Sequence, residues 1–178
     1  MTTVPESKSI QALRRASAEK RLARISKEAR LRAEGMKEVG RLSRRDYFIA
    51  GLALYWGEGY KSLGQEVGFT NSDPAMILFF IRWLSKCYGI TQDRLILRVS
   101  INILHIHRVK EVERYWSRLA GIPLSQFTKI SLIKSISKKR YANESVHYGT
   151  LRVKVRRGTD LRRKILGSVE KCKQSATL

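Results

Sequence analysis

The sequence has few cysteines, few acidic side chains and no long apolar run, and each shortage excludes a class of protein. Only two cysteines occur in 178 residues, with no CxxC or Cys/His cluster, which excludes a disulfide scaffold and argues against structural zinc. No stretch approaches the roughly 18–20 apolar residues that span a bilayer. The first residues, MTTVPESKS, lack the apolar region of a signal peptide. We therefore expect a cytoplasmic protein without a membrane partner.

The shortage of acid leaves a large excess of base, which is unevenly distributed. Lys and Arg number 36 against 15 Asp and Glu, a net charge of +21. Residues 1–45 carry 13 basic and 5 acidic side chains, residues 46–126 carry 9 and 7, and residues 127–178 carry 14 and 3. A nearly neutral middle between basic flanks indicates a face or an arm for a polyanion, and nucleic acid is favoured over membrane.

Hydrophobic periodicity predicts an α+β fold with a basic helical extension, 1–45, before one main domain, 46–178. Apolar residues make up 43% of the chain, enough for a folded core. Helices are expected at 8–44, 46–58, 74–88, 108–120 and 159–172, and strands at 66–71, 94–104, 127–133 and 148–156. In residues 94–104, Val99, Ile101 and Ile103 are expected to point to one side and Arg98, Ser100 and Asn102 to the other.

The extension at 1–45 has two interpretations. Good helix formers dominate residues 8–44, but their apolar stripe is thin and is weakened by Gly35 and Gly40. The segment is either a solvated helical extension or a basic arm that lies along DNA or RNA.

Residues 46–59, DYFIAGLALYWGEG, contain no charge between positions 47 and 57. Apolar side chains would point in every direction from this helix, which is typical of a helix that is buried all round. Ala50, Ala53 and Gly57 are spaced i, i+3, i+7 and form a ridge with almost no side chain. A second helix could approach this ridge closely.

Glu58 follows this apolar run and is the candidate catalytic residue. A carboxylate is disfavoured at the C-terminal end of a helix, where the helix dipole is negative, so a cation is expected nearby. One candidate cation is Mg²⁺, held by Glu58 and a backbone carbonyl such as that of Gly57. Two copies packed through the ridge would bring two Glu58 carboxylates together for metal-assisted phosphodiester hydrolysis. Alternatively, Glu58 caps the helix, pairs with Lys61 or faces solvent.

The segment GLALYWGEG, residues 51–59, resembles the signature helix of LAGLIDADG homing endonucleases. Gly57, Glu58 and Gly59 stand on the motif's final Ala-Asp-Gly, and Ala53 stands on its internal Gly. The resemblance implies a four-stranded mixed or antiparallel sheet with helices on one face, and with its other face in the major groove of double-stranded DNA. It also implies that Glu58 binds the catalytic metal and that one motif per chain requires a homodimer, with an interface formed by Ala50, Ala53, Leu54 and Gly57.

The sequence departs from this family pattern at three places, one of which is a very short first strand in the first hairpin. Trp56 occupies the first acidic position of the signature, and the helix expected at 108–120 interrupts the usual order of elements. The chain is also similar to bacterial proteins that carry such a domain, which implies association with the bacterial nucleoid. Sporulation regulators use a related domain without cleavage, so the fold alone does not imply a nuclease.

Basic side chains in and around the expected strands are the candidate nucleic-acid contacts. Arg152, Lys154 and Arg156 would form a row on one strand face, about 7 Å apart, and Arg there could pair with guanine. Lys154 could also stabilise charge during catalysis. The full set of candidate contacts is Lys61, Arg98, Lys129, Lys134, Lys138, Lys139, Arg140, Arg152, Lys154, Arg156 and Arg157.

Three functions remain open on these residues. The first is a homodimeric, Mg²⁺-dependent DNA endonuclease, the second is a DNA-binding regulator that does not cleave, and the third is an RNA-binding maturase or accessory protein. A subunit of a larger nucleoprotein assembly is a further alternative.

Overall fold

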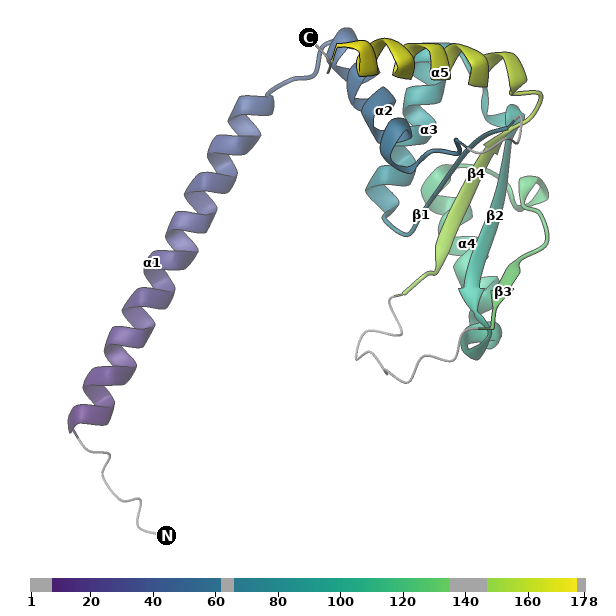
Figure 1. Ribbon diagram of the computed structural model, residues 1–178. Helices are drawn as coiled ribbons and strands as arrows, with labels where there is room; N and C mark the ends of the chain where they lie inside the picture. The colour runs from purple at the N-terminus through teal and green to yellow at the C-terminus, as the bar shows by residue number, and fades with distance from the viewer. Residues whose placement is uncertain (1–7, 62–65, 135–146, 176–178) are drawn as a thin grey trace. The chain divides into compact units, whose positions relative to one another are not determined.

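The computed structural model describes residues 8–61, 66–134 and 147–175, which belong to two compact units, residues 1–43 and 44–178 (Figure 1). The division falls close to the expected one after residue 45. In the first unit the described element is α1, Lys8–Val39. The helix stops before the expected residue 44 because Gly40 adopts a positive φ of 54° and its N–H bonds to the Met36 carbonyl.

The second unit is an α+β fold, which confirms the fold class predicted from hydrophobic periodicity. Its described helices are α2 (Arg44–Glu58), α3 (Pro74–Tyr88), α4 (Val109–Ala120) and α5 (Thr159–Gln174), with short 3-10 helices η1 (Gln92–Arg94), η2 (Ile103–Arg108) and η3 (Leu124–Gln126). Its described strands are β1 (Val67–Asn71), β2 (Leu95–Asn102), β3 (Ser131–Ile133) and β4 (Thr150–Val155). They form one mixed sheet in the order β1-β4-β2-β3. β4 runs antiparallel to β1 and β2, whereas β3 is parallel to β2.

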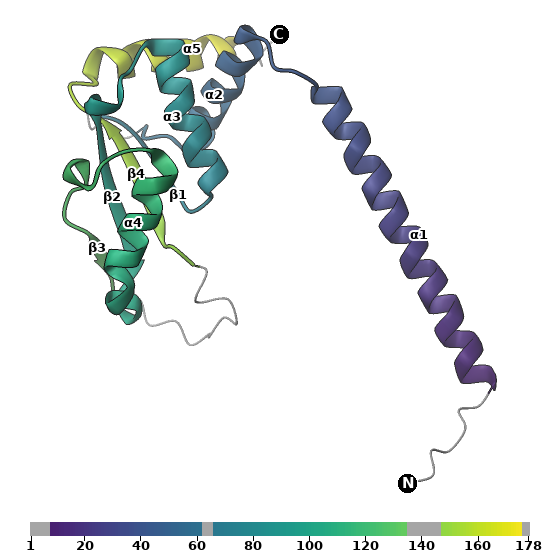
Figure 2. The same ribbon diagram turned by 180° about the vertical axis from the view of Figure 1, so that it is seen from behind.

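The helices leave one face of the sheet open. Figure 2 shows α3 and α4 in front of the sheet, and α2 packs against α3, α5 and the edge strand β1. α5 crosses the end of the sheet at which β4 finishes (Figure 1). No described helix of this second unit lies over the opposite face, which is turned to the viewer in Figure 1. Within the described ranges, no helix has both the length and the apolar character needed to cross a membrane.

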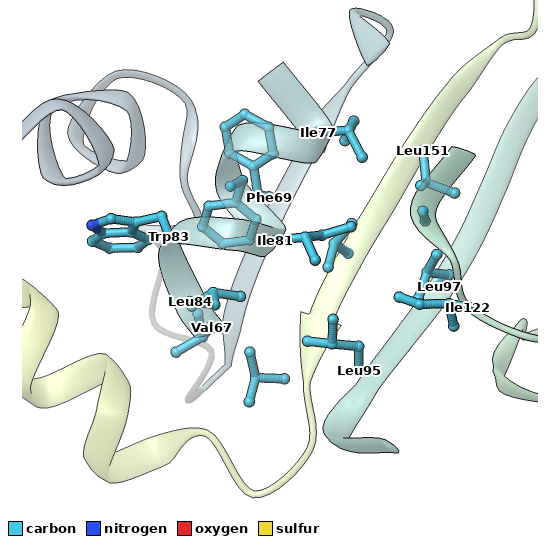
Figure 3. Packing of buried hydrophobic residues seen from close by; sticks show 14 of the residues in the cluster. Val67, Phe69, Ile77, Ile81, Trp83, Leu84, Leu95, Leu97, Ile122 and Leu151 are labelled. Carbon is cyan, nitrogen blue, oxygen red and sulfur yellow. The ribbon is translucent and has the colours of Figure 1, made fainter. Parts of the chain in front are cut away.

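The core lies between the sheet and the helices α2 to α5, and Figure 3 shows part of it beside α3. The alternation predicted for the last strand is confirmed, because Leu151, Val153 and Val155 are all buried. The indole of Trp83 is buried, and its Nε1–H donates a hydrogen bond to the Phe48 carbonyl oxygen at 3.1 Å. Asp73 begins α3 as expected, and its carboxylate accepts from the N–H of Ala75 at 2.7 Å.

All four expected strands are shorter than predicted, and β2 and β3 are examples. β2 ends at Asn102, whose side chain accepts from the Leu104 N–H at 2.9 Å and so starts η2. Ile103 therefore leaves the row of Val99 and Ile101 and is 38% exposed instead of buried. Only residues 131–133 of the expected strand at 127–133 join the sheet as a strand.

Candidate nucleic-acid interface

The open face of the sheet is built by the residues that alternate with the core positions. The pairing register aligns these residues in rows across β1, β4 and β2. One row is Thr70, Arg152 and Arg98; the next is Gly68, Lys154 and Ile96; and on the other side Thr150 faces Ser100. The open face thus carries cations, hydroxyl groups and little apolar surface.

Arg98 and Arg152 form the centre of this face. They are directly opposite each other in the antiparallel ladder of β2 and β4, and both are half-buried. The Nε atom of each is buried and has no hydrogen-bond partner among the described residues, and no described carboxylate forms an ion pair with either. Like charges placed opposite each other destabilise a sheet, and an unsatisfied buried donor costs about 1–3 kcal/mol. The pair is therefore a built cationic centre that no described carboxylate compensates.

Lys154 is different, because it already has an anionic partner. Its ammonium forms an ion pair with Glu66, the residue just before β1, and its side chain is only 19% exposed. Lys154 does share the open face with Arg152, as the sequence predicted. Its charge is balanced within the chain, whereas the charges of Arg98 and Arg152 have no counter-ion in the part of the chain that the structure describes.

Tyr60 and Thr70 also belong to the open face, and sequence reasoning missed both. The Tyr60 ring lies over Gly68, where a methyl group would collide with it. The Tyr60 hydroxyl is 2.8 Å from the Thr70 hydroxyl, and its backbone N–H donates to the Gly68 carbonyl at 2.9 Å. Gly68 inside a strand was the available signal, since glycine there often marks a close approach by another group.

Arg156 and Arg157 are exposed in the turn between β4 and α5. Arg156 lies one residue beyond β4, so the expected row of three strand cations contains two, Arg152 and Lys154. Arg157 has a positive φ of 51°, a conformation that is costly for a residue with a side chain. The Arg94 guanidinium holds this turn by donating to the carbonyl oxygens of Arg156 and Arg157 at 2.8 and 3.1 Å.

The remaining candidate contacts are Lys61, Lys129 and Lys134, which the structure describes, and three that it does not. Lys129 and Lys134 are exposed on either side of β3. Lys61 lies at the end of α2, where it bonds to backbone carbonyls. Lys138, Lys139 and Arg140 lie outside the described residues.

Within one chain, α2 is buried on one face only, which corrects the expectation of burial all round. Gly51 and Tyr55 are buried against the core, and at Gly51 a methyl group would overlap the Trp83 indole. The close approach of helices thus occurs at Gly51. On the outer face, Ile49 and Trp56 are 37% and 38% exposed.

The predicted interface residues lie on or beside that outer face. Ala53 and Gly57 are exposed, whereas Ala50 and Leu54 are half-buried. Nothing within 4 Å would meet a methyl group at Gly57. The ridge of small residues is therefore accessible in the single chain.

Glu58 is exposed at the end of α2, and Lys61 supplies a cation to the backbone at the same helix end. The Lys61 ammonium donates to the carbonyl oxygens of Trp56 and Gly57 at 2.6 and 2.9 Å, which offsets the negative end of the helix. The Gly57 carbonyl expected to join Glu58 as a metal ligand is thus engaged by an ammonium group. The described residues contain no group of three His, Cys, Asp or Glu side chains that could hold a metal.

No family model matches the chain, and the searches of curated proteins and of solved structures also gave no match.

Proposed function

We propose that residues 44–178 bind double-stranded DNA through the open face of the sheet, as a LAGLIDADG-like domain. The observation that carries the proposal is the Arg98–Arg152 pair, whose charges face each other without a described counter-ion. A ligand that brings negative charge or hydrogen-bond acceptors to this pair would remove both the repulsion and the unsatisfied donors. Phosphates and the guanine edge do this, because guanidinium groups bind both in bidentate geometry.

Duplex DNA suits the shape of this surface as well as its charge. A twisted sheet or β-ribbon can enter the major groove, which is about 12 Å wide. Hydroxyl groups of Thr70, Thr150 and Ser100 flank the arginine pair and could contact base edges or phosphates. The major groove of duplex RNA is too narrow and deep for such contacts, which favours DNA over RNA.

The unit acts as a homodimer through the outer face of α2. Ile49, Ala53 and Trp56 lie at i, i+4 and i+7 and place exposed apolar surface on one helix face. The exposed Gly57 would let a partner helix approach closely. Pairing of two such faces would bury this surface and present two open sheets to one duplex.

Binding is better supported than cleavage. The Gly57 carbonyl of the expected Mg²⁺ site accepts a hydrogen bond from Lys61, whereas the Arg98–Arg152 centre needs no further group from the chain. Cleavage requires the second Glu58 of a homodimer and release of the Gly57 carbonyl by Lys61. We therefore propose a DNA-binding protein first and a metal-dependent nuclease second.

The binding test compares Arg98→Gln and Arg152→Gln with Arg163→Gln. Arg163 is exposed on α5 and pairs with Asp160 at 3.1 Å, so its replacement removes the same charge away from the open face. Fluorescence anisotropy with a labelled random-sequence duplex should show each open-face variant binding about 5–150-fold more weakly, or 1–3 kcal/mol. Arg163→Gln should bind like the unmodified chain. Equal binding by all four proteins contradicts the proposal.

Two further measurements separate the rival functions. Unlabelled duplex RNA that competes as well as duplex DNA would favour the RNA-binding alternative. Incubation of plasmid DNA with Mg²⁺ should leave it intact, with Glu58→Gln as the control. Nicking by the unmodified chain and its loss in Glu58→Gln would establish the nuclease alternative.

A further inference from the structure

α1 is a second charged surface that the proposed function does not use. Its 32 residues include ten basic and four acidic side chains. The charge is concentrated, because residues 14–32 contain eight basic and two acidic residues, a net of +6. Beyond residue 32 the helix is nearly balanced. The cationic part of α1 is thus a defined segment of the helix.

The side chains of α1 are exposed throughout the described part of the helix. Its apolar residues do not form a core, since Leu22 is 66% exposed and Ile25 is 46% exposed. A helix of this kind gains little from packing and depends on local interactions. The accumulated positive charge opposes it, because like charges three or four residues apart destabilise a helix.

One face of the cationic segment is suited to a phosphate backbone. Lys20, Arg24 and Lys27 are spaced i, i+4, i+7 and so share a face, with Lys20 and Lys27 about 10 Å apart along the axis. Arg24 pairs with Glu28 at 3.5 Å, but both side chains are about two-thirds exposed and such pairs contribute little. A phosphate could replace that carboxylate at small cost.

We infer that α1 is a second nucleic-acid-binding element that contacts the phosphate backbone without regard to sequence. Lys20 and Lys27 are its central contacts. Binding neutralises the repulsion within the helix and releases counter-ions from the nucleic acid. The inference does not require the open sheet face to bind, because α1 carries its charge independently of that unit.

Other occupants fit this helix less well. An anionic membrane is disfavoured because residues 8–39 contain no Trp, Tyr or Phe, the residues that anchor interfacial helices. A second copy of α1 is disfavoured because residues 14–32 of each copy carry a net charge of +6, and the two copies would repel each other. Arg15 and Arg32 also interrupt the apolar stripe of Leu22, Ile25 and Met36.

The test uses the full chain with Lys20→Gln and Lys27→Gln combined. The matched control combines Lys171→Gln and Lys173→Gln, which remove the same charge from exposed positions on α5. The dissociation constant is measured against salt concentration on two duplexes of unrelated sequence. The α1 variant should lower the slope of log affinity against log salt by about 2 on both duplexes. The control should leave the slope unchanged.

A second measurement follows the helix itself. Far-UV circular dichroism of the unmodified chain should show added helicity when duplex is present, and a smaller gain for the α1 variant. An unchanged salt slope for the α1 variant overturns the inference. So does binding to phosphatidylserine vesicles in place of duplex, or a native mass that falls when Leu22→Asn disrupts self-pairing of α1.

The outcomes for α1 and for the open sheet face are distinguishable. Loss of slope in the α1 variant, with no effect of Arg98→Gln or Arg152→Gln, supports α1 and contradicts the proposed function. The reverse pattern contradicts the role of α1 alone. A full chain that binds no nucleic acid contradicts both.

Discussion

Two glycines of α2 have opposite roles, which predicts opposite effects of the same substitution. At Gly51 an added methyl group overlaps the Trp83 indole, whose Nε1 is fixed by its bond to the Phe48 carbonyl. Gly51→Ala should destabilise the fold by about 1–3 kcal/mol through overpacking. Gly57 has free space around it in the single chain, so Gly57→Ala should be neutral or stabilise the helix by up to about 1 kcal/mol at a protein concentration at which the chain is monomeric. Urea unfolding of both variants measures this, and equal effects would contradict it.

Arg157 stores conformational strain at the end of β4. Its φ of 51° lies in the left-handed region, which costs a residue with a side chain about 1–2 kcal/mol. Arg157→Gly should therefore raise the free energy of unfolding by about 1 kcal/mol. Arg156→Gly is the control and should lower it, because Arg156 has no positive φ and glycine adds entropy to the unfolded chain. A lower midpoint temperature of thermal unfolding in both variants would contradict strain at Arg157.

The Arg98–Arg152 pair could be foreseen only in part. Alternation along each strand predicts which side of the sheet each arginine occupies, so their placement on the open face followed from the sequence. Their direct opposition depends on the register between β2 and β4, which alternation does not specify. The pairing of Lys154 with Glu66 was missed for the same reason: their proximity comes from the pairing of β1 with β4.

At the scale of elements, Arg108 and Glu111 join the start of α4 to the chain that enters β4. Two Arg108 nitrogens donate to the Glu111 carboxylate at 3.1 and 3.0 Å, and another bond reaches the His147 carbonyl at 3.1 Å. The same guanidinium lies 5.5 Å from the ring centroid of Tyr148. The hydrogen bond from Arg108 lowers the pKa of Glu111 from its ordinary value of 4.5.

This lowered pKa predicts an acid-dependent stability. The ionised pair stabilises the fold above pH 4.5, the ordinary value, and the stabilisation is lost as the pH falls through the lowered pKa of Glu111. Glu111→Gln should therefore be less stable than the unmodified chain at neutral pH. The difference should vanish at acid pH. Glu113→Gln on the same helix is the control, and urea unfolding at both pH values is the measurement.

Elements with clear start and stop residues were predicted with accurate bounds, whereas elements without such residues were not. The helix at 74–88 has an Asp-Pro start and a glycine end, and it was found with the expected bounds. The strand expected at 127–133 has only three residues in the sheet, and its pairing parallel to β2 follows from the path of α4, which the sequence does not specify. The prediction that α2 is buried all round was also wrong for the single chain. An apolar helix can pack one face against the core of its own chain and leave the other face exposed.

At the scale of the whole molecule, the outer face of α2 predicts the oligomeric state. We expect a native mass of two chains, with Ala53→Arg reducing it to one because a charged side chain would lie in the proposed contact. Ala75→Arg is the control, since Ala75 is exposed on α3 away from this face. Native mass spectrometry decides the matter. A single-chain mass for the unmodified protein bound to duplex would contradict the homodimer.

The position of β4 in the sheet also affects how the chain is made. β4 is the last strand in the sequence, yet it lies between β1 and β2 and is the ladder partner of both. A ribosome must therefore deliver the chain as far as Val155 before the two earlier strands can pair through β4. Until then, β1 and β2 cannot bury their apolar faces in a completed sheet. We expect chaperones to bind the chain mainly during this period.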